Sequence, residues 1–203
     1  MRAVVLAASF GLLFVSAILS PWGQRTDELL FNILATGSEA VNAAAGILRS
    51  GLLLALGAVA LVLGVMALRR SQIWAAVALA TMCAVSGALS VLLRDTLLVR
   101  PTYDHAAAYL VNTFPSTHAT LTCSFAVTIL VLWPYRSLQE RVVVRSGVVL
   151  TVILACLANV VSYSHRPADV LGSVLLVGFV ASLAGTVAPR SMAPSTGSFH
   201  PVD

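Results

Sequence analysis

The feature that most constrains this chain is a series of long apolar runs, each close to the length of a membrane span. A helix needs about 20 mostly apolar residues to cross the hydrocarbon core of a bilayer. Hydrophobic residues make up 59% of the chain and charged residues only 10%, whereas a soluble domain carries roughly 25% charged residues. We therefore predict an all-α, polytopic membrane helix bundle with six transmembrane helices, near residues 3–21, 45–68, 72–93, 117–134, 146–164 and 169–188.

The basic residues indicate how these spans are oriented. Six spans place both termini on one side of the membrane. If that side is the cytoplasm, the cytoplasmic segments carry seven arginines and the opposite segments five, which follows the positive-inside rule. We therefore expect an integral protein of the bacterial plasma membrane with both termini in the cytoplasm.

Outside the spans the sequence predicts little additional structure. We expect one membrane domain, residues 1–188, and a disordered cytoplasmic tail, residues 189–203, rich in Ser, Pro and Gly. Residues 24–50 fit either a short amphipathic helix in the membrane interface or an ordinary connector. The net charge of +4 is not massed in one basic patch, so we expect membrane lipids and not nucleic acid as partners. The sequence does not indicate an oligomeric state.

Polar residues recur in three clusters, at residues 94–101, 114–118 and 163–169, each next to the end of an apolar run. Counting spans from the N-terminus places all three on the extracytoplasmic side. They combine histidines, arginines and a carboxylate with the N-termini of two predicted helices. Helix N-termini attract anions, and the arginine fork matches phosphate oxygens. The sequence therefore predicts a phosphate site at this face.

These clusters resemble the motifs of the type 2 phosphatidic acid phosphatase superfamily, whose pattern is KxxxxxxRP, then PSGH, then SRxxxxxHxxxD. Arg100 and Pro101 match the end of the first motif. Residues 115–118 read PSTH and match the second motif with Thr in place of Gly. His165 and Asp169 match the end of the third. The resemblance extends over about residues 94–172 and implies a six-span membrane phosphatase.

The resemblance implies a role for each matching residue. His165 would attack phosphorus and form a phosphohistidine, and Asp169 would accept a hydrogen bond from its other ring N–H and so orient the ring. His118 would protonate the leaving group and later activate water. Phosphate oxygens would be held by Arg100, Ser116 and Thr117. The mechanism that the resemblance implies needs no metal and no cofactor.

Two departures from the family pattern bear on this expectation. The family lysine position is Leu93, with Arg94 beside it, and the SR pair is replaced by Ala158 and Asn159. A shift of one residue turns a helical side chain by about 100°, so Arg94 reaches the phosphate only if the local turn is irregular. Arg166, next to the predicted nucleophile, is a second candidate to replace the lost positive charge.

Two functions follow from these motifs. The first is a lipid phosphatase that hydrolyses a phosphomonoester or pyrophosphate of a polyprenyl or phosphatidate-like lipid at the extracytoplasmic face. The alternative is a catalytically weakened family member that binds a lipid phosphate or serves as a structural subunit of a membrane complex. The missing Lys and Arg favour the alternative, whereas the retained His118, His165 and Asp169 favour the enzyme.

Overall fold

The computed structural model describes residues 1–35, 37–101, 103 and 112–187. Every regular element in that part of the chain is helical, so the predicted all-α fold is confirmed. The predicted tail at residues 189–203 lies outside the described residues, and the domain boundary near residue 188 stays a prediction. The helices are α1 Arg2–Leu13, α2 Pro21–Leu34, α3 Glu39–Arg69, α4 Ile73–Leu92, α5 Thr117–Leu132, α6 Leu138–Val161 and α7 Pro167–Val187, with π-helical turns at Phe14–Ile18 and Leu93–Leu97 after α1 and α4.

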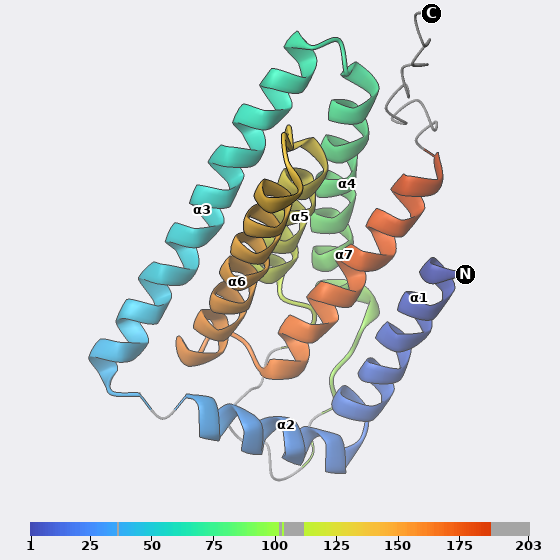
Figure 1. Ribbon diagram of the computed structural model, residues 1–203. Helices are drawn as coiled ribbons and strands as arrows, with labels where there is room; N and C mark the ends of the chain where they lie inside the picture. Colours follow the sequence, from blue (N-terminus) through green and yellow to red (C-terminus); the bar gives the residue numbers. More distant parts are fainter. Residues whose placement is uncertain (36, 102, 104–111, 188–203) are drawn as a thin grey trace, which may run out of the picture.

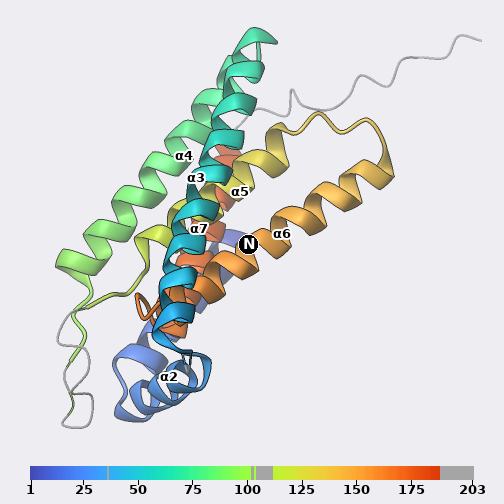
Figure 2. The ribbon, with the colours of Figure 1, turned by 90° about the vertical axis from the view of Figure 1, so that its left-hand side faces the viewer.

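The long helices form one bundle, and α2 lies across one end of it (Figures 1 and 2). α1 packs against α7, α3 against α5 and α6, and α4 against α5 and α7. The turn between α3 and α4 lies at the opposite end from α2. The start of α5 and the connection between α6 and α7 are at the same end as α2.

Length and composition support only some of the predicted spans. Among the described residues, four helical segments are long and apolar enough to cross a membrane: Glu39–Arg69, Ile73–Leu97, Leu138–Val161 and Pro167–Gly185. The segments Arg2–Ile18 and Pro21–Leu34 pass the test only together and are bent by 87°, which allows up to five spans. The prediction of six spans is therefore supported only in part.

The remaining predicted span corresponds to α5, which is short and central. Its 16 residues extend about 24 Å, less than the roughly 30 Å of a hydrocarbon core. α5 contacts α3, α4, α6 and α7, so other helices shield it. Its buried hydroxyls donate to carbonyl oxygens four residues earlier, which satisfies them within the helix; they belong to Thr120, Thr122, Ser124 and Thr128.

The sharp bend before α2 depends on a cap and a close backbone contact. The Ser20 hydroxyl accepts the N–H of Gly23 at 2.9 Å, and Pro21 takes the first helical position, which favours a helix start. A Cβ on Gly23 would lie 1.7 Å from the carbonyl oxygen of Ser16. Only glycine therefore permits α2 to fold back this closely.

α2 is amphipathic in an unusual sense, because polar side chains are on its buried face. Gln24 and Asp27 are buried together with Phe31, whereas Leu29 and Ile33 are exposed. The Gln24 amide donates to the backbone carbonyl oxygens of Ile18 and Pro101. The helix thus turns Gln24 and Asp27 toward the bundle end and its leucines outward.

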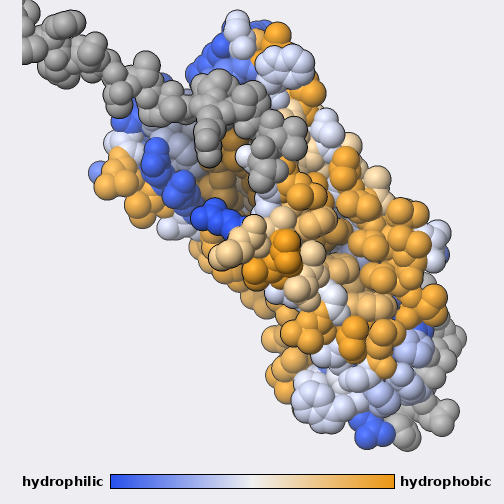
Figure 3. Space-filling model, turned by 90° about the vertical axis from the view of Figure 1, so that its right-hand side faces the viewer, coloured by the Kyte–Doolittle hydropathy of each residue, from blue (hydrophilic) through white to orange (hydrophobic). Residues whose placement is uncertain are grey.

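The outer surface of the bundle is apolar. Figure 3 shows hydrophobic residues over the middle of one face and more hydrophilic residues toward both ends. Large exposed hydrophobic side chains occur on every long helix, including Leu12, Leu54, Val143 and Leu171. An apolar surface of this kind is favourable in contact with lipid but not in contact with water. The protein is therefore an integral membrane protein.

Candidate active site

The three polar clusters predicted to share one face meet at the bundle end that α2 covers. The first follows α4, the second leads into α5, and the third connects α6 to α7. Direct contacts join them: Arg100 pairs with Asp169 at 3.2 Å, and the Ser116 N–H donates to the Asp169 backbone carbonyl at 3.2 Å. Residues far apart in the sequence therefore form one polar centre.

The Asp169 carboxylate is the centre of this network and is fully buried. Its Oδ2 accepts the Thr113 hydroxyl at 2.5 Å and the Arg166 backbone N–H at 3.0 Å. Its Oδ1 accepts Nη2 of Arg100 at 3.2 Å. These donors stabilise the ionised carboxylate at a site where burial alone would make the charge costly. Asp169 is thereby held in one orientation beside His165.

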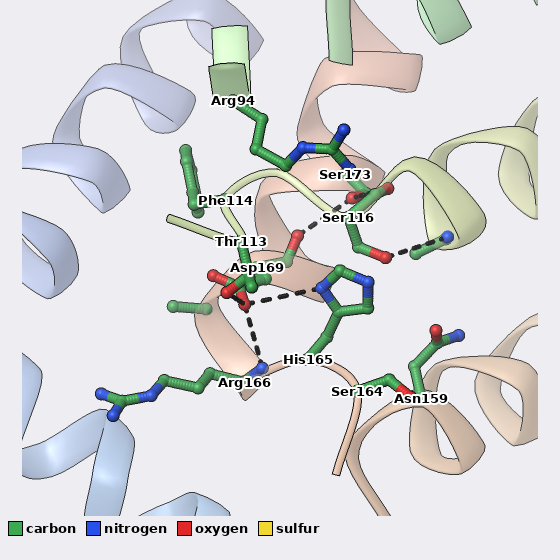
Figure 4. A network of polar contacts seen from close by, with 12 residues as sticks. Arg94, Thr113, Phe114, Ser116, Asn159, Ser164, His165, Arg166, Asp169 and Ser173 are labelled. Atoms are coloured by element: carbon green, nitrogen blue, oxygen red, sulfur yellow. Dashed lines mark hydrogen bonds and ion pairs between the residues drawn. The ribbon is translucent and has the colours of Figure 1, made fainter. Parts of the chain in front are cut away.

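His165 lies beside this carboxylate, with one ring nitrogen toward it, as Figure 4 shows. Its Nδ1 is 3.7 Å from Asp169 Oδ2, which is longer than a hydrogen bond, so the hydrogen bond expected between them is not formed in this geometry. Two backbone contacts position the residue: the N–H groups of Ser164 and His165 both approach the Asn159 carbonyl oxygen at 3.2 Å. With Nδ1 toward Asp169, the other ring nitrogen, Nε2, is left for a ligand.

The second cluster forms the N-terminus of α5. Ser116 is the N-cap, and its hydroxyl accepts the Ala119 N–H at 3.3 Å. The next two residues, Thr117 and His118, open the helix and are half-buried. The Ser116 N–H bonds to the Asp169 carbonyl oxygen, so this helix start lies against the segment that carries His165. The Ser116 hydroxyl, expected at the phosphate, serves here as the helix cap.

Arg94 reaches this N-terminus because the end of α4 is irregular. Residues Leu93–Leu97 form a π-helical turn, a distortion often found at functional sites. Arg94 donates from Nη1 to the Thr117 hydroxyl at 3.2 Å, and its Nε is 2.6 Å from Asp95. The irregular turn that the sequence argument required for Arg94 is therefore present.

Arg100 and Arg166 take different positions from those expected of phosphate ligands. Both are buried, and Arg100 lies between two carboxylates, 3.2 Å from Asp169 and 4.0 Å from Asp27. The Arg166 side chain points away from the His165 imidazole (Figure 4) and interacts electrostatically with Asp27. In this geometry both arginines stabilise buried carboxylates, those of Asp27 and Asp169. Their assignment to phosphate stays a prediction.

Two residues of this centre were not singled out from the sequence. Asp27 of α2 accepts the Ala168 N–H at 2.9 Å, and Thr113 donates to Asp169. Asp27 lies among other polar residues of α2, including Gln24, Arg25 and Glu28, so nothing local marked it, and its partner Ala168 is 141 residues away. Thr113, just before the second motif, offered no signal beyond its position.

A metal centre is not apparent in the described part of the chain. No group of three or more His, Cys, Asp or Glu side chains there is arranged to hold a metal ion. The polar centre instead combines two carboxylates, two histidines, arginine side chains and two helix N-termini. This set of groups suits an anionic ligand.

Comparisons with known proteins support the motif assignment. The model of the PAP2 superfamily matches residues 75–192, more than half of the chain. The crystal structure of the first transmembrane PAP2-type phosphatidylglycerolphosphate phosphatase from Bacillus subtilis is similar, with a TM-score of 0.70, 20% sequence identity, and coverage of 91% of this chain and 94% of that one. No curated protein matches the chain. At this identity, the structural likeness shows a shared fold.

Proposed function

The chain belongs to the PAP2 superfamily, and on this basis we propose that it is a membrane lipid phosphatase acting through a phosphohistidine intermediate. Its substrate would be a phosphomonoester or pyrophosphate of a polyprenyl or phosphatidate-like lipid. The proposal depends most on one observation: His165 lies 3.7 Å from a buried, fully oriented Asp169, in a segment that lies against the N-terminus of α5, which carries His118.

The proposed reaction has two steps that use these residues in turn. Nε2 of His165 attacks phosphorus, the bond from phosphorus to the leaving oxygen breaks, and His118 gives that oxygen a proton. Asp169 stabilises the positive charge on the His165 ring. His118 then takes a proton from water, whose oxygen attacks the phosphohistidine and releases inorganic phosphate and neutral His165. No step passes through a metal.

Phosphate oxygens would be held mainly at the N-terminus of α5. The N–H groups of Thr117 and His118 come before the first intrahelical bond, which Thr120 makes to Ser116, so they are available to an anion. Arg94 is anchored at the same helix end through Thr117. Arg100 would stabilise the site through Asp169.

The fold suggests how a lipid substrate would reach this site. We propose that α1, α3, α4, α5, α6 and α7 cross the membrane and that α2 lies in the interface, where its exposed Leu29, Leu30 and Ile33 contact lipid. The arginine distribution favours an extracytoplasmic site. Arg100 and Arg166 weaken that distribution. The Arg100 side chain is 5% exposed and Arg166 is buried, so their place in the polar centre gives them a separate reason for being on this side.

The identity of the headgroup is the open part of the proposal. The Bacillus subtilis protein with the same fold is described as a phosphatidylglycerolphosphate phosphatase, which makes that headgroup one to test. Polyprenyl phosphates, polyprenyl pyrophosphates and phosphatidate are the others. The alternative, a lipid-phosphate binder or structural subunit, is favoured by Leu93 and Asn159, which stand where the family carries basic residues.

The test is phosphate release by the purified protein in detergent from these four lipid classes. We expect release from at least one of them by the wild type and none above background by His165→Ala. His200→Ala makes the same change outside the motifs and should retain full activity. Equal release by wild type and His165→Ala would exclude the phosphohistidine mechanism, and phosphate binding without release would favour the alternative.

A further inference from the structure

Arg49 of α3 is a cation at the polar centre that none of the motifs includes. The residue is half-buried, and its Nε is buried without a hydrogen-bond partner among the described residues. The ion pairs found in that part of the chain involve Arg94, Arg100 and His165, and none involves Arg49. A buried guanidinium nitrogen without an acceptor is costly, which calls for an explanation.

The packing of α3 against α5 places Arg49 at the level of His118. A Cβ on Gly57 would lie 3.1 Å from the Phe125 ring, and further along both helices Leu63 packs with Ile129, so α3 and α5 run in the same direction. Counting back from the contact of Gly57 with Phe125, Arg49 is about 12 Å down α3 and His118 about 10.5 Å down α5. The two residues therefore lie within about one residue of the same level.

The packing of α3 against α6 is an independent contact that also gives the level of Arg49 in the bundle. A Cβ on Gly46 would lie 3.9 Å from Cβ of Ser162, and these helices run in opposite directions (Figure 1). Arg49 comes three residues after Gly46, and Asn159 comes three residues before Ser162. Both steps move about 4.5 Å in the same direction, so Arg49 and Asn159 are level with each other.

Asn159 is the residue that replaces the arginine of the third motif, and the structure shows it beside His165 (Figure 4). Its Nδ2 donates to the Ala155 carbonyl at 2.8 Å, and its Oδ1 is buried without a partner among the described residues. The Asn159 amide is neutral and supplies no positive charge. Arg49 is level with Asn159 by the contact of Gly46 with Ser162, so a guanidinium is nonetheless present at this level.

We propose that Arg49 binds the phosphate group of the substrate and supplies from α3 the positive charge that α6 lacks at Asn159. The inference rests on the proposed function in that the ligand is a lipid phosphate. A phosphate oxygen would give the buried Nε its missing acceptor, and Arg49 with Arg94 would place two guanidinium groups around the open N-terminus of α5. Arg49 is then a phosphate-binding residue contributed by a helix outside the three motifs.

The experiment compares Arg49→Ala, Arg49→Lys and the double variant Arg49→Ala/Asn159→Arg with wild type in detergent. Arg25→Ala removes an exposed arginine of α2 and is the matched control. Two quantities are measured: affinity for inorganic phosphate by calorimetry, and kcat/KM with the lipid that the wild type hydrolyses. Thermal unfolding and size-exclusion profiles establish that each variant is folded.

We expect Arg49→Ala to lower kcat/KM by roughly 10²-fold, the effect of losing one preorganised donor, and to weaken phosphate binding. Arg49→Lys should recover part of both, and Asn159→Arg should restore at least about tenfold of kcat/KM in the Arg49→Ala background by returning a guanidinium to the same level. Arg25→Ala should match wild type in both measurements. Rescue by Asn159→Arg distinguishes phosphate binding from a purely structural role.

The outcomes separate this inference from the proposed function. Normal turnover and phosphate affinity in folded Arg49→Ala would overturn the inference and leave the phosphatase intact, with Arg49 serving only at the lipid interface. Phosphate binding that depends on Arg49, in a protein without turnover, would support the inference and overturn the enzyme. A wild type that neither binds phosphate nor hydrolyses lipid would overturn both. If Arg49→Ala does not fold, the phosphate affinities of folded Arg49→Lys and of the single variant Asn159→Arg are compared with that of wild type. The inference would be overturned if Arg49→Lys binds phosphate at least as tightly as wild type and Asn159→Arg leaves the affinity unchanged.

Discussion

The N-termini of α5 and α7 meet at the same polar centre, yet the protein satisfies one and leaves the other open. At α7 the Arg166 N–H donates to the Asp169 carboxylate and the Ala168 N–H to Asp27. Between them Pro167 has no N–H to satisfy, and the Asp169 N–H reaches the Arg166 carbonyl. The positive end of α7 is therefore neutralised by two carboxylates of the protein itself.

At α5 only two of the first N–H groups have partners within the part of the chain that the structure describes. The Ser116 N–H donates to the Asp169 carbonyl, and the Ala119 N–H to the Ser116 hydroxyl. The N–H groups of Thr117 and His118 have no intrahelical acceptor. Positive side chains gather there, because Arg94 donates to Thr117 and Arg49 is level with His118.

This difference shows how one physical property of helices serves two purposes. Every helix N-terminus attracts negative charge. At α7 that attraction holds Asp169 and Asp27 in place and so fixes the scaffold beside His165. At α5 it is left for an anion from outside, beside both histidines. Substitutions at α5 should therefore affect turnover, whereas those that open α7 should affect stability.

The largest effect should come from Arg94→Ala, on the α5 side. Removing this guanidinium should lower kcat/KM by about 10²-fold. The free energy of unfolding should change by less than about 0.5 kcal/mol, because the ion pair of Arg94 is with the half-exposed Asp95 and its other contact is a single hydrogen bond to Thr117. Asp95→Asn is the control, since it removes a charge but keeps Arg94, and it should affect kcat/KM far less. Reduced stability with unchanged turnover in Arg94→Ala would contradict the proposed distinction, in which the N-terminus of α5 serves turnover and that of α7 serves stability.

Asp27→Asn tests the α7 side and should have the opposite profile. The variant weakens the charge-assisted bond to the Ala168 N–H and should lower the free energy of unfolding by about 1.5 to 3 kcal/mol, while kcat/KM changes little. Thermal unfolding in detergent gives the first quantity and lipid turnover the second. Glu28→Gln, at the neighbouring position in α2, should leave stability close to wild type. Lost turnover at normal stability would place Asp27 in the reaction itself.

The smallest effect should come from the hydroxyl that joins the two termini. Oγ of Ser173 lies 2.8 Å from the Ser116 carbonyl oxygen and 2.9 Å from the Asp169 carbonyl oxygen. Ser173→Ala should cost about 1 kcal/mol of stability and reduce turnover slightly by loosening α5 against α7. Ser182→Ala, further along the same helix, removes a hydroxyl bonded only to the Gly178 carbonyl and should have a smaller effect. Equal losses in the two variants would show that the bridge contributes nothing special.

The place of the polar centre could be predicted from the sequence, but most of its internal contacts could not. The clusters containing Arg94, His118 and His165 were expected on one side, and the structure brings them together. Arg166 was a candidate phosphate ligand in the sequence, whereas its side chain points away from the imidazole. Neighbours in sequence lie at the same membrane level, but the direction of each side chain depends on the local turn. The side chains of His165 and Arg166 therefore point in different directions at the start of α7.

Asp27 and Arg49 illustrate what the sequence could not provide. Each is on a helix that contains none of the motifs, and each reaches the centre through packing: α2 folds back at Gly23, and α3 aligns with α5 and α6. A carboxylate or arginine near a span end is usually an interfacial residue, so nothing local distinguishes these two. Their role follows only from the register of one helix against another.

The sequence by itself determined that this protein is a membrane-embedded helix bundle with a histidine and arginine site at one end. These properties are local, since a run of about 20 apolar residues or a short motif can be recognised without its neighbours. Only the tertiary structure decided which helix N-terminus stays open, which arginines face the histidines, and how far α5 needs to extend. Those depend on contacts between residues as far apart as Asp27 and Ala168, which close packing establishes and no local pattern encodes.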